Sequence, residues 1–489
     1  MTAVLFAALL LPGMAEANSV ETLPEGIFAI GLKWGFKWAT EQFGNDFGTG
    51  TTSIVQDYNI TITGADLDPT RFTTDDILGT LDVTYDSYGM EFSITTAYGI
   101  TDNLSVMMII PIQYTHNEFN VELLGSNMYL QRDAEGNPVI PVNETLAPAL
   151  GLTETMNTQD FFDILSCETG GQICQFRYKP IKNWSRWGLG EVITGLRYKF
   201  FDNQKWRQGI TLFNKWPTGR HKQTDDLFDI NFGDQNWDVG FWYGVDYMPI
   251  QDLMFNVSGG YTEQLPFVRQ KRIWGRNIDP DTGKERGAIP VAEYWKKIPT
   301  HIDYGGNWDL YWGFTWIPRW VPFLNFSNEF YFFWKYHDNY WAEEAPQDPN
   351  GNPWTPDFRA MEWGTQTSAI EMTNAIGFNT IGWVQRGEFP VPLQFAVGYT
   401  VGIAGKHFER QNSVWLSLDL IGSIYMFEEA VATEEDKELE DFKLPARAAT
   451  DPDAPAGALA EERESEKERK LREAGEWQNS FGKVRKYGW

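Results

Sequence analysis

The stretch that decides the fold is residues 88–114, which read YGMEFSITTAYGITDNLSVMMIIPIQY. Every second residue from Tyr88 to Ile100 is large and mostly apolar, while the residues between them are small, polar or charged. After a tight turn at 100–103, the alternation continues from Leu104 to Tyr114. A period of two residues is typical of β-strands. An apolar face with aromatic ends is typical of strands that face lipid between two membrane interfaces.

The same alternation recurs along the chain. Residues 26–38 place Phe28 and five further apolar side chains on one face, with Lys33 and Lys37 on the other. Lysines opposite an unbroken apolar face fit a wall between lipid and a wet lumen better than a soluble sandwich. The twelve predicted strands are 26–38, 88–100, 104–114, 190–201, 209–216, 237–247, 253–261, 302–316, 324–336, 368–384, 391–404 and 413–427.

Loop lengths alternate in the same order as the strands. Short turns follow the second, fourth, sixth, eighth and tenth predicted strands, whereas four of the six other loops are long. Outer-membrane barrels sort their connections in this way, and soluble sandwiches and propellers have no reason to do so. We therefore predict an all-β fold: a transmembrane antiparallel β-barrel of about 12 strands (12–14) with long extracellular loops.

The two ends of the chain differ from the barrel. Residues 1–17 carry an apolar core, a Pro-Gly break and a small-x-small cleavage site, which predict a signal peptide although a basic start is missing. Residues 18–427 are assigned to the barrel. Residues 428–489 are rich in charges and helix formers, so we predict a charged periplasmic tail that is either solvated or tethers a periplasmic partner.

Composition narrows the possible functions. The net charge of −27 argues against nucleic acid as a partner, because no basic surface neutralises phosphates. Aromatic residues make up 15% of the chain, but no apolar run after residue 17 approaches the roughly 20 residues of a membrane helix. We expect location in the bacterial outer membrane. The expected partners are outer-membrane lipid, the barrel-assembly machinery and a small-molecule solute.

Motifs for catalysis and metal binding are scarce. None of the five histidines has ligand spacing, and neither a P-loop nor GxSxG occurs. We predict no cofactor, metal site or catalytic residue; His116 and Ser105 are too far apart along one strand to act together. The loops at Asp133, Asp279 and Asp348 resemble calcium loops but lack the full ligand set, so turns are the better interpretation.

Two local features belong to the predicted compartment. Cys167 and Cys174 are the only cysteines, and an oxidising compartment favours a disulfide between them over two unrelated thiols. Gly422, Tyr425 and Phe427 form a Gly-x-x-aromatic-x-aromatic ending of the last strand. This ending resembles the assembly signal of outer-membrane barrels, although Phe427 does not end the chain.

The inward face supplies the candidate functional residues. Mixed charge in a narrow lumen keeps it hydrated, and opposed charges set selectivity. The alternative is that these residues form structural ion pairs in a plugged barrel. The predicted pore-lining residues are Lys33, Lys37, Glu91, Arg197, Lys199, Asp238, Asp246, Asp303, Asp309, Glu329 and Lys335.

Four blocks of sequence carry a family resemblance. They are residues 81–114 with YGITDNLS, residues 188–201 with GLGE, residues 210–219 ending in PTG, and residues 252–261. Their order and spacing resemble the outer-membrane family named for the meta-pathway of phenol degradation, which is related to long-chain fatty-acid transporter barrels. The resemblance implies a barrel for passage of hydrophobic or aromatic compounds, and it transfers no site residue.

Three functional hypotheses follow. The first is a channel for passive passage of small, hydrophobic or aromatic solutes through the outer membrane. The second is a structural or interaction barrel whose loops and tail bind partners. The third is a membrane-embedded hydrolase, for which the sequence supplies neither a motif nor a Ser–His pair at reacting distance.

Overall fold

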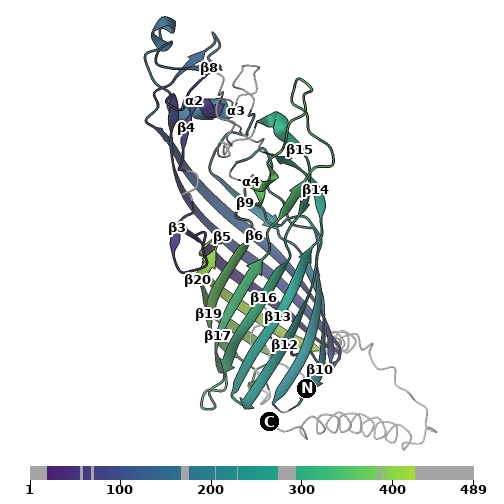
Figure 1. The fold of residues 1–489 in the computed structure, drawn as a ribbon. Helices are drawn as coiled ribbons and strands as arrows, with labels where there is room; N and C mark the ends of the chain where they lie inside the picture. The colour runs from purple at the N-terminus through teal and green to yellow at the C-terminus, as the bar shows by residue number, and fades with distance from the viewer. Residues whose placement is uncertain are drawn as a thin grey trace, which may run out of the picture.

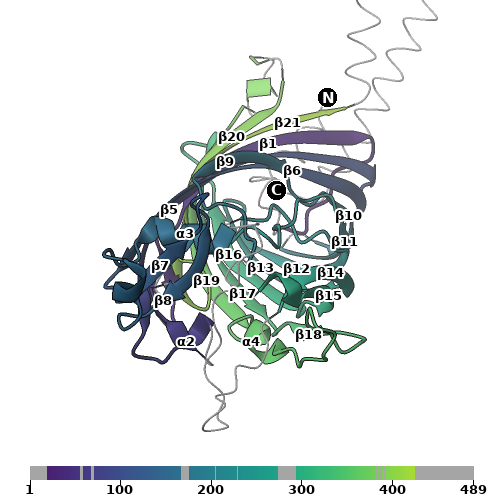
Figure 2. The same ribbon diagram turned by 90° about the horizontal axis from the view of Figure 1, so that it is seen from above.

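The chain folds as a closed antiparallel β-barrel (Figures 1 and 2). The computed structural model describes residues 19–54, 59–67, 71–166, 176–203, 205–227, 229–273, 293–380, 383–384, 388–389 and 391–423. The wall strands are β1 (Ile27–Trp38), β5 (Ile77–Thr101), β6 (Leu104–Leu124), β10 (Ile193–Asp202), β11 (Trp206–Lys215), β12 (Asp238–Ile250), β13 (Leu253–Gln264), β16 (Asn307–Trp316), β17 (Leu324–Lys335), β19 (Thr367–Asn379), β20 (Leu393–Lys406) and β21 (Asn412–Ser423).

Strand pairing confirms the predicted twelve-stranded wall. The first and last strands, β1 and β21, pair from Ile27↔Ser423 to Trp38↔Asn412. The ring continues through β20 to β10 and closes through β6 and β5. Two short strands, β4 (Thr61–Thr63) and β9 (Trp184–Leu189), extend the same sheet beyond the ring. Most short turns gather at one end of the barrel and the longer connections at the other, as the loop lengths predict. The predicted strand 368–384 is wrong at its end, because β19 stops at Asn379 and the longer segment 380–392 leads to β20 at the turn end.

Side-chain exposure follows the predicted alternation. Leu212 and Val257 are 55% and 52% exposed, whereas their neighbours Thr211 and Ser258 are buried. A monomeric soluble protein rarely exposes a contiguous apolar band of this kind, and in a transmembrane barrel the band faces lipid. Among the described residues, no helix is long and apolar enough to cross a membrane.

The predicted strand 302–316 is wrong at its start. Ile302 and Asp303 belong to β15 (Lys297–Asp303), which pairs with β14 (Phe267–Arg272) and β18 (Asn339–Trp341) in a separate three-stranded sheet. The wall strand starts only at Asn307, after a break at Gly305–Gly306. Asp303 therefore lies outside the wall. Alternation continues through the break, so the period of two did not reveal it.

The loop end carries structure of its own. Its elements are β2 (Glu41–Phe43), β3 (Thr51–Ser53), α2 (Gly64–Leu67), β7 (Tyr129–Arg132), β8 (Pro138–Val142), η3 (Ala147–Leu150), α3 (Thr158–Ser166), η4 (Tyr294–Lys296) and α4 (Phe358–Glu362). The extended tips of β5 and β6 pack with α3 and neighbouring segments around a small apolar core that includes Leu78, Met128 and Phe161.

Two of the three Asp-rich loops are turns, as predicted. The Asp133 carboxylate accepts hydrogen bonds from the backbone and side chain of Asn137, and Asp348 accepts the equivalent pair from Asn352. These bonds lower the pKa of both carboxyls. Turn donors therefore occupy the carboxylate oxygens in both loops.

Several predictions fall outside the described residues. They are the signal peptide 1–17, Cys167 and Cys174, the Asp279 loop, Tyr425, Phe427 and the tail 428–489. Of the predicted assembly signal, the structure describes Gly422, which lies in β21 opposite Phe28 of β1.

Candidate functional site in the lumen

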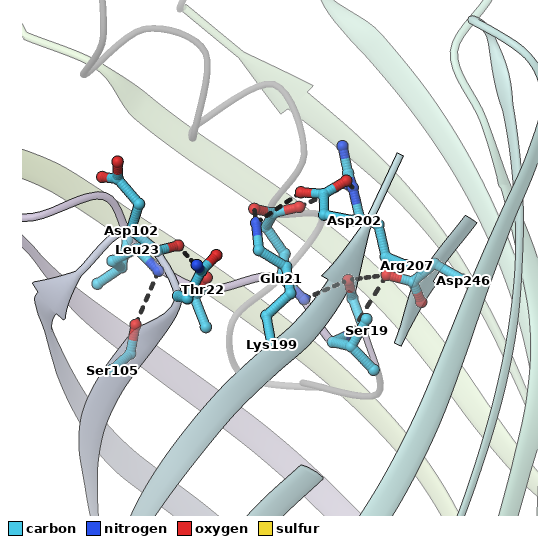
Figure 3. A network of polar contacts seen from close by, with 12 residues as sticks. Ser19, Glu21, Thr22, Leu23, Asp102, Ser105, Lys199, Asp202, Arg207 and Asp246 are labelled. Atoms are coloured by element: carbon cyan, nitrogen blue, oxygen red, sulfur yellow. Dashed lines mark hydrogen bonds and ion pairs between the residues drawn. The ribbon is translucent and has the colours of Figure 1, made fainter. Parts of the chain in front are cut away.

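A short segment before β1 lies across the turn end of the lumen (Figure 3). We call residues 19–25 the strap. The buried Glu21 carboxylate lies 2.8 Å from Nζ of Lys199 and 2.6 Å from Nη1 of Arg207, and Lys199 also lies 2.9 Å from Asp202. Lys199 and Arg207 are themselves buried. The strap therefore supplies the carboxylate that pairs with two cations on the lumen side of β10 and β11.

Hydrogen bonds fix the strap on both sides of Glu21. Ser19 Oγ donates to Asp246 at 2.8 Å on β12. At the other side, Thr22 Oγ1 donates to the Asp102 carbonyl at 2.7 Å, and the Leu23 amide donates to Ser105 Oγ at 2.9 Å. These anchors lie at the β5–β6 turn, on β6 and on β12, so the strap runs along the inside of the neighbouring strands β5, β6, β10, β11 and β12 at the turn end.

The strap fits only because β5 has a glycine beneath it. A Cβ at Gly99 would overlap the carbonyl oxygens of Leu23 and Pro24. We expect Gly99→Ala to displace the strap and raise ion conductance in planar bilayers. Gly35→Ala is the control, because its Cβ would meet nothing closer than 3.7 Å. Equal conductance in both variants would contradict the close packing of the strap on β5.

A cavity of about 470 Å³ lies within the barrel among β6, β10, β11, β12, β13, β16 and β17. One side of its lining is a row of aromatic rings that come from β11, β12, β16 and β17. Trp242 contacts Phe213 and Tyr311 at centroid distances of 5.2 and 5.7 Å, and Tyr311 stacks on Tyr331 at 4.5 Å. Met107, Ile109 and Ile193 supply apolar lining from β6 and β10. The cavity is therefore shaped for apolar and aromatic surface.

Polar groups line the remainder of the cavity. Asp309 accepts hydrogen bonds from Tyr331 Oη at 2.6 Å and Asn307 Nδ2 at 2.8 Å. Lys215 lies 3.3 Å from the fully buried Asp238. Asp309 thus has two neutral donors and Asp238 a cationic partner, so hydrogen-bonded polar groups line this side of the cavity.

The structure places the predicted inward residues in different surroundings. Arg197, Lys199 and Asp246 meet the strap, and Asp309 and Lys335 line the cavity. Asp238 is buried against Lys215, Lys33 lies over Trp415 with Nζ 4.6 Å from the ring centroid, and Glu329 is half-buried on β17. Lys37 and Glu91 lie 3.9 Å apart, and Lys37 lines a second cavity of about 250 Å³. Their role in passage stays a prediction.

Sequence reasoning missed two groups of residues. Glu21 and its strap precede the first strand, where no periodic signal exists. Trp242, Tyr311 and Tyr331 share the inward face with the predicted charges, but only charged residues were selected there. Selecting every large inward side chain would have found the aromatic row.

A serine–histidine pair occurs where none was expected. His116 Nδ1 lies 2.7 Å from Ser185 Oγ of β9, and Tyr88 stacks on the imidazole. Ser105, the serine considered from sequence, instead accepts a hydrogen bond from the strap. No described carboxylate or amide side chain hydrogen-bonds to His116, so the described residues do not complete a catalytic triad.

Comparisons with known proteins return distant structural likenesses. No protein-family model and no curated protein matches the chain. Solved structures similar to it include an outer membrane channel from Pseudomonas putida F1, with a TM-score of 0.45, 9% identity, and coverage of 83% of this chain and 98% of that one.

Two transporters give lower scores. The Ralstonia pickettii toluene transporter TbuX gives a TM-score of 0.30 at 11% sequence identity, and the match covers 81% of this chain and 89% of that one. The P. putida toluene transporter TodX gives a TM-score of 0.29 at 10% sequence identity, and the match covers 82% of this chain and 91% of that one. All three scores are below 0.5, so the fold rests on the strand pairing itself: a closed, twelve-stranded transmembrane β-barrel.

Proposed function

We propose that this barrel is an outer-membrane channel for passive passage of small apolar or aromatic solutes. The observation that carries the proposal is the aromatic row of Trp242, Tyr311 and Tyr331 inside a closed wall. A water-filled pore for ions needs no stacked rings, whereas a ring or alkyl group gains about 25 cal/mol per Å² of apolar surface that it buries there.

The strap gives the channel a closed turn end. A solute in the cavity leaves toward the turn end after the strap moves, or through the wall into lipid. Both routes keep an apolar solute away from the charged surface of the loop end. We place the loop end outside the cell and the turn end, with the tail 428–489, in the periplasm, as is usual for outer-membrane barrels.

Blocking the cavity tests the proposal. Thr262 lines the cavity and is buried, so Thr262→Trp fills part of the 470 Å³. We expect the initial uptake of radiolabelled ethylbenzene by cells that express the barrel to fall about tenfold, which corresponds to ~1.4 kcal/mol. Val239→Trp adds similar bulk on the lipid side, where Val239 is exposed, and serves as the control.

The outcome separates two functions. Uptake that is the same with and without the wild-type barrel would overturn the channel. The interaction barrel would then gain support, because the loop end has its own apolar core and offers a preformed surface to a partner. Pull-down with a chain that lacks 428–489 would test the tail in that case.

A further inference from the structure

Four basic residues gather on β14 and on the connection between β11 and β12, next to Asp234 at the edge of the lumen cavity. Arg269 and Lys271 share one face of β14 with Phe267, opposite the exposed Val268 and Gln270. His221 and Lys222 lie in the connection between β11 and β12, close enough for Arg269 and Lys222 to act on the Lys271 ammonium. We call His221, Lys222, Arg269 and Lys271 the basic roof.

Hydrogen bonds hold the two parts of the basic roof together. Thr224 Oγ1 donates to the Gln270 carbonyl at 2.8 Å, and the Arg269 guanidinium donates to the Asp234 carbonyl at 2.8 Å. Asp234 also lines the lumen cavity. The β11–β12 connection and β14 are therefore held side by side next to the cavity, and Arg269 is the member of the basic roof that makes one of these two bonds.

The cations of the basic roof have no ion pairs, unlike their neighbours. Arg220 pairs with Asp229, whereas Arg272 and Lys297 both pair with Asp225 at 2.8 and 2.7 Å. Within the described part of the chain, no carboxylate lies within 4.0 Å of Lys222, Arg269 or Lys271. His221 adds a buried Nδ1 that has no hydrogen-bond partner there.

The electrostatics favour an added negative charge. Burial lowers the pKa of Lys271, and the charges of Arg269 and Lys222 lower it further. The pKa of Lys222 is also lowered, because the surrounding protein partly desolvates its ammonium group. Lys222 still has exposed surface, so its side chain faces an enclosed space that holds water. Such crowding of like charge is relieved by an anion.

The acids nearby relieve this crowding only in part, because Asp226, Asp229, Asp234, Asp338 and Glu191 act on these cations from beyond ion-pair distance. Asp229 is held by Arg186 and Arg220, and Asp338 pairs with Lys335 and accepts from the Gly305 amide. Asp234 accepts from Asn231, and Asp226 acts on Lys222 only from beyond ion-pair distance. Asp229, Asp338 and Asp234 each have a partner of their own, which leaves the basic roof only partly neutralised.

We propose that the basic roof binds the carboxylate of an aromatic acid whose ring enters the lumen cavity. This inference rests on the proposed channel and narrows its solutes to organic anions of that class. Lys222 and Lys271 supply charge-assisted hydrogen bonds to the carboxylate. The aromatic row accepts the ring, so the carboxylate and the ring are held by different walls.

Calorimetric titration of the purified full chain in detergent tests the assignment. Benzoate is compared with benzamide, a neutral molecule of nearly the same shape. We expect benzoate to bind at least about tenfold more tightly, a difference of ~1.4 kcal/mol. The double variant Lys222→Gln/Lys271→Gln should lose this preference and keep its affinity for benzamide. Lys205→Gln, exposed at the turn end, is the control for lost charge.

Each other outcome overturns a definite claim. The carboxylate site would be overturned if the wild type bound benzoate and benzamide with equal affinity, or if the double variant kept the preference for benzoate. In either case, binding of benzamide would still support the channel. Failure of both ligands to bind would count against the channel itself. If inorganic phosphate displaced bound benzoate as effectively as unlabelled benzoate does, the basic roof would be a general anion site. The assignment to aromatic acids would then be overturned.

Discussion

Replacing Glu21 by alanine is expected to open the turn end of the barrel. The change leaves the buried Lys199 and Arg207 without the strap carboxylate, while Asp202 stays within ion-pair distance of both. Breaking a buried ion pair from one side costs about 3–5 kcal/mol. The neutral hydrogen bonds that hold the strap at Thr22 and beyond contribute only about 1 kcal/mol each.

Single-channel recording in planar bilayers measures this opening. We expect conductance to rise several-fold in Glu21→Ala. Glu25→Ala is the matched control, because it removes the same charge from the same strap, but the Glu25 side chain is exposed. If the two variants conduct equally, the strap does not close the lumen. Solute uptake should rise with conductance if passage follows the turn end, and should not change if the solute leaves through the wall.

A charge on the lipid face should also cause a large loss of stability. Leu212 is 55% exposed on β11, so Leu212→Arg places a guanidinium against lipid. Such substitutions cost about 2–4 kcal/mol at the bilayer midplane and about 0–1 near its interfaces. The measurement is the free energy of unfolding by urea in lipid vesicles.

Leu124→Arg provides the comparison at another height. Leu124 is 48% exposed, but it lies at the end of β6, beyond Asn117, where β6 no longer pairs with β9. Its substitution should cost almost nothing, because this end of β6, which pairs with the start of β5, stands outside the membrane. Equal losses at Leu124 and Leu212 would mean that the apolar band is not in contact with lipid.

The barrel was predictable because lipid and lumen impose opposite demands on successive residues. The predicted strand starts at Tyr88, whereas β5 starts at Ile77. Above Tyr88 the outward side chains are Asp82, Thr84 and Asp86, all exposed, because this part has left the membrane. The sequence pattern therefore marked the membrane boundary rather than the strand end.

The lumen was predictable only in part. Parity placed Arg197, Lys199 and Asp246 on the inward face, where they are buried. It did not identify their partners, since Glu21 lies far away in sequence and reaches Lys199 only where β1, β5, β6 and β10 lie side by side. The prediction that Asp303 lines the pore was wrong for a related reason. Alternation does not distinguish a strand of the barrel wall from a strand of a neighbouring sheet.

The pairing of β1 with β21 also sets an order of events in assembly. It joins the first and last wall strands, so its loop-closure entropy is the largest in the ring and it is expected to form late. The strap directly precedes β1, and its cationic partners lie on β10 and β11. These strands join β1 through β5 and β6 and not through the β1–β21 pair. Lys199 and Arg207 are therefore expected to acquire their carboxylate in the first half of the ring, before the last strand closes it.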